Sequence, residues 1–315
     1  MPPTTAAPKA VVDAVHQVTF GPVSDFRNLS IVPLLSHEDR EVDYLTLDEA
    51  FAGAWVQVTE VSESGQVSEL KVVVKGDRPV LLVDGEELVG AKQNRVLNLT
   101  ILVPANSTTV IPVSCVESGR WHHRSRGFAS SPHAHFAEGR AANVRQVTSS
   151  LMAGGDRRSD QGEVWRMVAE KSARFRVASE TSAMSELFDK VGASLDDFVA
   201  ACSPTEHQVG AVFFINGRPA GLELFDAAGT WRKLSPKLVR SYAVDALDRG
   251  GSEPFQEPGA EAPNQFASAV ASSPSSSFPA AGEGEDVRLT GAEIAGAALV
   301  ARGRAVHVSA FPQRV

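Results

Sequence analysis

The run VLNLTILVPANSTTVIPVSCV, residues 96–116, carries no charged side chain. A stretch of roughly twenty apolar residues is typical of a membrane span. This run, however, contains Pro104, Asn106 and Pro112 together with several hydroxyl side chains, which interrupt a helix and favour a turn. Its many β-branched residues fit a pleated sheet. The run therefore predicts two strands around a turn, and no membrane partner is expected.

The same strand-like pattern extends outward over residues 12–121, where turn signals such as Ser64-Gly65 separate short apolar runs. One short helix is expected inside this part, over residues 45–52, with Thr46 as its N-cap. The N-terminal third of the chain is therefore predicted to be rich in strands.

Beyond this part, the spacing of apolar residues changes to that of helices over residues 138–202. Residues 208–248 are expected to be mixed, because Asn216-Gly217 predicts a tight hairpin and a helical pattern follows it. Residues 285–315 have the pattern of further strands, with a turn signal between the last two.

These blocks predict a mixed α+β fold with a largely antiparallel N-terminal sheet, a helical middle segment and C-terminal hairpins that rejoin the sheet body. The alternative is a doubly wound parallel sheet, which strict alternation of strands and helices would favour. We expect one α+β body made of residues 12–248 and 285–315. Residues 249–284, dense in Gly, Ser, Pro, Ala and Glu, are predicted to be a flexible linker or surface loop.

Composition and charge exclude several classes of protein. The 315 residues are 43% hydrophobic and 22% charged, as in ordinary soluble proteins. A net charge of -8 repels phosphate backbones, so no nucleic-acid partner is expected. Cys115 and Cys202 alone provide neither a disulfide framework nor a structural zinc site. The cysteine usage, and a first segment without the pattern of an export signal, predict a cytoplasmic protein.

Polar side chains are concentrated in VDGEELVGAKQNRVLN, residues 83–98, directly after an apolar strand. The candidate general acids or bases are Glu86 and Glu87. The candidate ligand holders are Lys92, Asn94 and Arg95, because a guanidinium matches phosphate oxygens and an ammonium adds positive charge. The alternative is a solvated hairpin whose internal ion pairs contribute little to stability.

A second polar motif is CVESGRW, residues 115–121. Glu117 is a third candidate acid or base, while Arg120 is a candidate for holding a pyrophosphate and Trp121 for stacking on a base or sugar. The alternative is an ion pair between Glu117 and Arg120, with Trp121 filling the core. Cys115 is predicted to be a buried core residue, since no histidine is paired with it in the pattern.

Four histidines lie close together in the sequence: His122, His123, His133 and His135. Such spacings bind a metal when adjacent strands present them. Several arginines between residues 120 and 145 make this stretch basic, which repels a cation and favours an anionic small ligand. No metal site is therefore predicted.

Residues 83–98, PVSCVESGRW at 112–121 and FFINGRPAGLELFD at 213–226 together resemble the ADP-ribosylglycohydrolase- and rhodanese-phosphatase-associated domain family of bacteria. The likeness covers nearly the whole chain, and the histidines do not belong to its pattern. The resemblance implies a link to ADP-ribose and NAD-derived nucleotide metabolism, through association and not through a site.

Two classes of function follow from the sequence. The first is an enzyme or binding protein for a phosphorylated, ADP-ribose-like nucleotide. The second is a non-catalytic interaction module whose polar motifs only stabilise the fold. The sequence leaves open whether the protein is an enzyme, which cofactor it uses and which oligomeric state it adopts.

Overall fold

The structure is a computed structural model that describes residues 4–38, 40–62, 65–122, 124–250 and 255–313. Its helices are α1 (Lys9–His16), α2 (Leu47–Ala52), α3 (Ala137–Met152), α4 (Gln161–Arg174), α5 (Met184–Ala201), α6 (Ala228–Arg249) and α7 (Ala262–Ala271). Its strands are β1 (Thr5–Ala6), β2 (Thr19–Phe20), β3 (Ser24–Phe26), β4 (Leu29–Leu35), β5 (Leu45–Thr46), β6 (Val56–Glu60), β7 (Glu69–Val74), β8 (Val80–Leu82), β9 (Glu86–Gly90), β10 (Arg95–Leu97), β11 (Ile101–Val103), β12 (Thr108–Cys115), β13 (Phe128–Ala134), β14 (Gln208–Ile215), β15 (Arg218–Phe225), β16 (Pro274–Pro279), β17 (Glu285–Thr290), β18 (Ile294–Ala301) and β19 (Arg304–Pro312).

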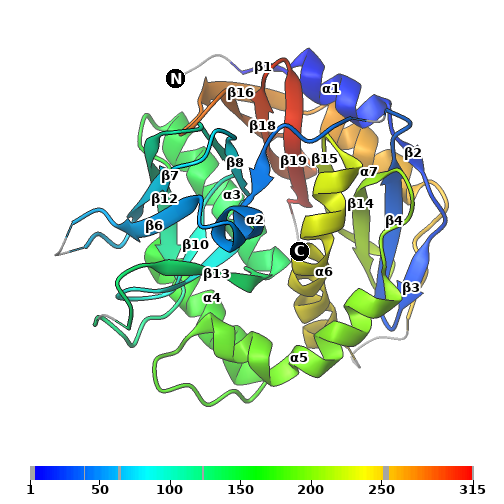
Figure 1. The fold of residues 1–315 in the computed structure, drawn as a ribbon. Helices are drawn as coiled ribbons and strands as arrows, with labels where there is room; N and C mark the ends of the chain where they lie inside the picture. The colour runs from blue at the N-terminus through cyan, green and yellow to red at the C-terminus, as the bar shows by residue number, and fades with distance from the viewer. Residues whose placement is uncertain (1–3, 39, 63–64, 123, 251–254, 314–315) are drawn as a thin grey trace.

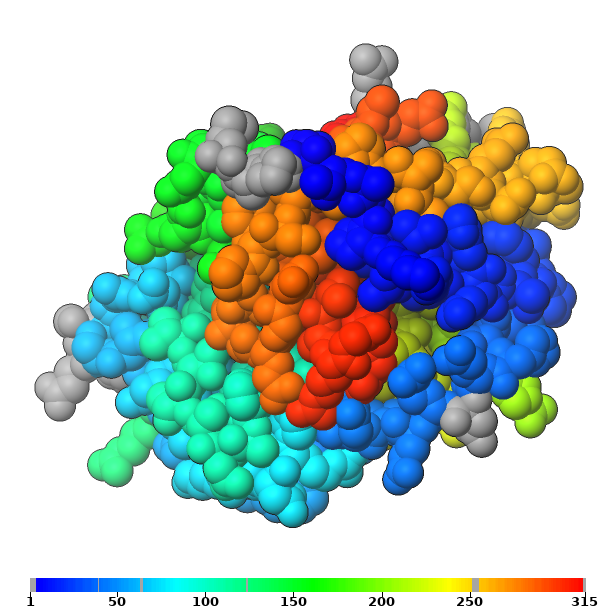
Figure 2. All heavy atoms as spheres, turned by 90° about the horizontal axis from the view of Figure 1, so that it is seen from above, coloured from blue at the N-terminus to red at the C-terminus, as the bar shows by residue number. Residues whose placement is uncertain are grey.

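The largest sheet contains both β1 and β19, the first and last strands of the described residues (Figure 1). Its strand order is β1-β16-β17-β18-β19-β15-β14-β4-β2, with β3 also paired to β4. The N-terminal segment lies across the C-terminal strands on the surface (Figure 2), where Thr5 pairs with Ser275 in antiparallel register. The C-terminal hairpins therefore join the first strands of the chain in one sheet.

A second sheet has the order β13-β9-β10-β12-β7-β6. Its two outer strands also approach each other, since a Cβ on Gly127, just before β13, would lie 3.1 Å from the carbonyl oxygen of Val58 in β6. This sheet, which we call the curled sheet, thus closes into a barrel-like body. Apolar side chains such as Val58, Val72 and Leu88 fill its inside.

The apolar run 96–103 is divided between two sheets and is not the single strand that its sequence predicts. Strand β10 belongs to the curled sheet, whereas β11 belongs to a three-stranded sheet of order β11-β8-β5. Asn98 marks the change of sheet, because its side chain donates to the backbone oxygen of Arg157 at 3.0 Å and accepts from Ser114 Oγ at 2.6 Å. No helix among the described residues combines the length and hydropathy needed to cross a membrane.

Helix α6 lies between the two larger sheets (Figure 1) and packs against β14 on one side and β13 on the other. Its buried Tyr242 stacks on Phe213 of β14, with ring centroids 3.8 Å apart. The same apolar cluster includes Phe188 of α5 and extends from Leu29 to Phe311. Helices and strands from the whole chain therefore share this core.

Two local predictions and the fold class are confirmed. Thr46 caps α2 in a capping box, in which the Glu49 carboxylate accepts from the Thr46 backbone N–H at 2.9 Å. Asn216 and Gly217 join β14 to β15 with φ angles of 49° and 71°, as a type I′ turn requires. The fold is mixed α+β with mostly antiparallel sheets.

The prediction of a flexible linker or surface loop over residues 249–284 is wrong for most of the part that the structure describes. Helix α7 and strand β16 both lie in this segment, and β16 pairs with β1 on one side and β17 on the other. The side chains of Phe266 and Val270 enter the core on one face of the largest sheet. Small residues allow α7 to pack closely, and the serines of β16 satisfy their backbone groups in the sheet. Residues 251–254 lie outside the described ranges.

This correction predicts that α7 contributes to stability. Replacing Val270, which is 0% exposed, with Ala should lower the free energy of unfolding by about 2 kcal/mol, because methyl groups leave a packed site. The exposed Ser268→Ala on the same helix is the matched control and should change it by less than about 0.5 kcal/mol. The free energy of unfolding of both variants is measured by urea titration. Equal losses in the two variants would contradict the packing of α7 on the core.

Candidate functional site

Both polar motifs lie at one end of the curled sheet. Because its neighbouring strands are antiparallel, β6, β9 and β12 end where β7, β10 and β13 begin. Residues 91–94, 116–122 and 124–127 meet there, at what we call the motif end. The predicted residues that the structure brings together at this end are Lys92, Asn94, Arg95, Glu117, Arg120 and Trp121. Glu86 and Glu87 begin β9, where Glu87 pairs in register with Val96, the residue directly after Arg95.

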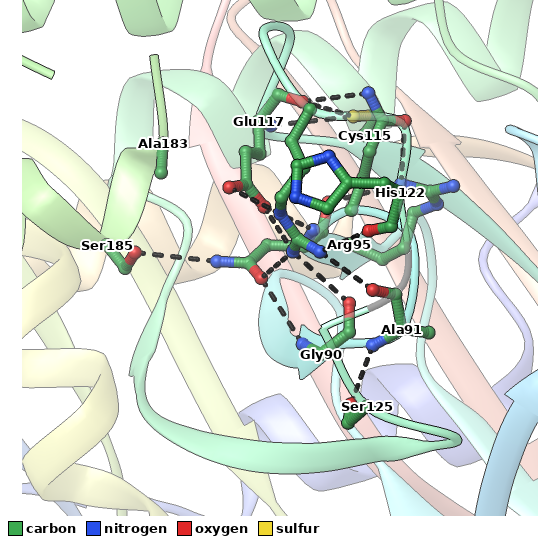
Figure 3. A network of polar contacts seen from close by, with 12 residues as sticks. Gly90, Ala91, Arg95, Cys115, Glu117, His122, Ser125, Ala183 and Ser185 are labelled. Atoms are coloured by element: carbon green, nitrogen blue, oxygen red, sulfur yellow. Dashed lines mark hydrogen bonds and ion pairs between the residues drawn. The ribbon is translucent and has the colours of Figure 1, made fainter. Parts of the chain in front are cut away.

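Arg120 and Glu117 form a buried ion pair at the motif end. Figure 3 shows the Glu117 side chain within this network of polar contacts. The guanidinium donates to the two carboxylate oxygens at 2.8 and 2.6 Å. It also donates to the backbone oxygens of Ala91, His122 and Gly90 at 2.7, 3.1 and 3.3 Å, and to the side-chain oxygen of Asn94 at 3.3 Å. Every N–H donor of Arg120 thus has a partner within the protein.

The Glu117 carboxylate is held in its charged form. Burial raises its pKa, but hydrogen bonds from Arg120 and from the Asn94 backbone N–H outweigh burial and lower it. The side chain of Asn94 in turn donates to Ser185 Oγ at 3.4 Å, in the first turn of α5. The pair therefore ties the two motif loops to a helix N-terminus.

Arg95 is buried inside the curled sheet with unused donors. It pairs in register with Leu88 on one side and Cys115 on the other, which places its side chain on the inner face. The side chain is 0% exposed. Its Nη1 donates to Gln93 at 3.1 Å, whereas Nε and Nη2 have no partner. Burial lowers the pKa of Arg95, because the buried environment disfavours the charged guanidinium.

Trp121 covers this part of the site and is 48% exposed, so the alternative of a tryptophan filling the core is wrong. The guanidinium of Arg95 lies 5.8 Å from the centre of the indole ring, and the ammonium of Lys92 lies 5.3 Å from it. Two cations therefore contact one half-exposed aromatic ring.

Cys115 is buried, as the sequence predicts. Burial raises the pKa of its thiol, while the neighbouring Arg95 acts in the opposite direction. Gln161 of α4 accepts from the Cys115 backbone N–H and donates to its carbonyl oxygen, both at 2.8 Å. The thiol is thus held protonated in the interior and lacks the features of a nucleophile.

Glu86 and Glu87 belong to separate contacts. Glu86 accepts from Lys237 of α6 at 2.8 Å, and although burial raises its pKa, this ammonium opposes the rise. Glu87 accepts from Ser131 at 2.9 Å, and one of its carboxylate oxygens has no partner. Among the described residues, neither carboxylate forms a hydrogen bond or ion pair with a residue of the motif end.

A fully buried polar network lies between α3 and the largest sheet. Arg140 donates to both oxygens of Glu223 at 2.6 and 3.1 Å and to Asp84 at 3.0 Å. Tyr242 and His307 contact the same Glu223 carboxylate at 2.9 and 3.0 Å. Sequence reasoning missed this network, because its members come from five separate segments. A charged residue on an apolar strand, such as Glu223, was the available signal.

The histidines are dispersed. His122 is exposed, His133 stacks on Phe188 with ring centroids 4.6 Å apart, and His135 is buried beside Phe136. His123 lies outside the described residues. Within the described ranges, no group of three or more His, Cys, Asp and Glu side chains is arranged to hold a metal.

His135 predicts a pH dependence of stability. Burial lowers its pKa from 6.5 to about 4, so the folded state keeps it neutral while the unfolded state takes up a proton below pH 6.5. This contribution, about 3 kcal/mol, is complete above pH 6.5 and is lost as the pH falls to 4. The free energy of unfolding, measured with urea at several pH values, should therefore fall less between pH 6.5 and 4 when His135 is replaced with Phe. The same fall in the variant as in the parent would contradict this assignment.

The structure also has a surface groove of about 200 Å³ between α1 and the ends of β15 and β19. Its lining includes Asp226 and Arg304, which form an ion pair at 2.6 Å. Tyr44 donates to the same aspartate. No residue of the motif end lines this groove, and its strongest charges are already paired with each other.

Comparison of the chain with curated proteins and with solved structures finds no match. A family model does match, over residues 17–311, and its description is the ARG and Rhodanese-Phosphatase-superfamily-associated Protein domain, ARPP-1. The matched range includes both strands of the Asn216-Gly217 hairpin and every residue of the motif end. Because the match covers most of the sequence, the chain belongs to the ARPP-1 domain family.

Proposed function

We propose that the protein binds an ADP-ribose- or NAD-derived phosphorylated nucleotide at the motif end. One observation carries the proposal: Arg95 is 0% exposed, yet its Nε and Nη2 have no partner. A buried guanidinium with unused donors costs free energy, and such a cost is typical of a binding site. A phosphate supplies the charge and the oxygens that Arg95 lacks.

The surroundings of Arg95 fit the other parts of such a ligand. The half-exposed ring of Trp121 offers a stacking surface for a base, and the ammonium of Lys92 beside it adds positive charge. Family membership supports the same ligand class by association. Arg120 and Glu117, whose hydrogen bonds are satisfied by each other and by the loops, act as positioning residues in this proposal.

A second candidate is the non-catalytic interaction module. It is favoured by the saturated contacts of Arg120, because a side chain that uses all its donors internally stabilises the fold without any ligand. On this view Trp121 is exposed for contact with another protein.

The test is thermal unfolding with ADP-ribose, NAD and simple nucleotide phosphates. A ligand at about a hundred times its Kd stabilises the native state by about 2.7 kcal/mol, which raises Tm by several degrees. Arg95→Met should lose this shift. Without ligand it should be as stable as the parent or more so, because an apolar side chain replaces an unsatisfied buried charge. A retained shift in Arg95→Met would refute the proposal.

A matched pair of tryptophan variants locates the ligand. Trp121 and Trp55 are 48% and 45% exposed, but only Trp121 lies at the motif end. Trp121→Ala should weaken the ADP-ribose shift, whereas Trp55→Ala should retain it. If no nucleotide shifts the parent, the interaction module is the better description.

A further inference from the structure

Glu60, the last residue of β6, is a second unsatisfied charge at the motif end. Its register partner Leu70 belongs to the apolar cluster inside the curled sheet, so the Glu60 side chain also points inward. The residue is 9% exposed, and neither carboxylate oxygen has a hydrogen-bond partner. A charged acceptor in this position needs donors that the described residues do not supply.

Glu60 and Arg95 belong to the same end and the same inner face of the curled sheet. Their opposite charges attract, and the Glu60 carboxylate raises the pKa of Arg95 against the larger effect of burial. Nevertheless, no hydrogen bond or ion pair joins them, and Nε and Nη2 of Arg95 stay unused along with both oxygens of Glu60. The pair therefore presents donors and acceptors to a third group.

A group that satisfies both side chains must carry an anion for Arg95 and hydroxyl donors for Glu60. A ribose phosphate has this combination, since carboxylates in nucleotide sites commonly accept hydrogen bonds from ribose hydroxyls. We propose that Glu60 accepts from the 2′- and 3′-hydroxyls of a ribose whose phosphate is bound by Arg95. This inference rests on the proposed function and adds a residue that recognises the ribose hydroxyls.

The same carboxylate sets a limit on the ligand. A phosphate on the 2′-oxygen removes a donor and brings a negative charge against Glu60, so 2′-phosphorylated nucleotides are excluded. Deoxyribose lacks one donor and leaves a carboxylate oxygen unsatisfied. Sites built to bind a hydroxyl discriminate strongly against ligands without it.

The experiment is calorimetric titration of the full chain with ADP, 2′-deoxy-ADP and pyrophosphate. The parent should bind ADP at least about tenfold more tightly than 2′-deoxy-ADP. In Glu60→Gln this ratio should fall towards one, while pyrophosphate binds as tightly as before or more so, because a negative charge near Arg95 is gone. A ratio unchanged in Glu60→Gln would overturn the inference.

Glu69→Gln is the matched control. Glu69 begins β7 at the same end of the sheet, but its side chain is on the outer face next to the inward Leu70. This variant removes the same charge and should keep the full preference for ADP. If the parent binds pyrophosphate and both nucleotides equally, only the role of Glu60 is refuted; if it binds none of them, the proposed function fails as well.

Discussion

Replacing Glu223 with Gln should lower the free energy of unfolding by about 3 to 5 kcal/mol, which is the cost of breaking a buried ion pair. The Arg140–Glu223 pair is 0% exposed on both sides. Burial raises the pKa of Glu223, but Arg140 and His307 together lower it to about 2. In the variant, Arg140 keeps only Asp84 as a charged partner, and the hydrogen bonds from Tyr242 and His307 weaken.

The matched control is the surface pair Arg166–Glu163, whose side chains are 53% and 33% exposed. Glu163→Gln removes the same charge from a solvated pair, so it should cost less than about 1 kcal/mol. The free energies of unfolding of the two variants are measured by urea titration, with one common value for the dependence on urea concentration. A loss of less than about 1 kcal/mol in Glu223→Gln would mean that the network does not hold α3 against the sheet.

The sequence predicts well those features that nearby residues determine. Thr46 and Glu49 are three residues apart, so their capping box needs only local geometry. Asn216 and Gly217 fix their hairpin through backbone preferences alone. The gathering of Arg95 and Trp121 was also predictable, because each motif directly follows or begins a strand of the same antiparallel sheet.

The errors arise where distant contacts decide the structure. Residues 96–103 have one apolar pattern, but Asn98 turns the chain between two sheets through contacts with Ser114 and Arg157. The serine-rich segment containing β16 is ordered because β1 and β17, far away in the sequence, complete its hydrogen bonds. The composition of this segment indicates only that it has few apolar side chains to bury. It contains no information on the partner strands β1 and β17.

Glu86 and Glu87 are close to Lys92 in the sequence, which suggests one polar loop. In the structure the two glutamates begin β9 and Lys92 follows its end, so Glu86 accepts from Lys237 and Glu87 from Ser131 instead. Glu60 shows the converse case, because it is distant from Arg95 in the sequence. It ends a strand whose pattern predicts only packing, and its position near Arg95 depends on closure of the curled sheet.

Arg120→Met should be among the most destabilising substitutions at the motif end, at about 3 to 5 kcal/mol. The variant leaves Glu117, which is 1% exposed, without its charged partner. It also removes the donors that the backbone oxygens of Gly90, Ala91 and His122 share. Urea unfolding measures the loss, and adding Glu117→Gln to Arg120→Met should recover part of it, because the unpaired charge is then removed as well.

Arg95→Met is the contrasting substitution, since both arginines are almost fully buried at the same end of the same sheet. Arg120 has a partner for every donor, and Arg95 does not. If both arginines served only to stabilise the fold, replacing either one with Met should lower the free energy of unfolding. We expect a loss for Arg120 and none for Arg95, because the unused Nε and Nη2 donors of Arg95 offset its few contacts when no ligand is bound. Equal losses in the two variants would place Arg95 in the structural framework and remove the main argument for a ligand there.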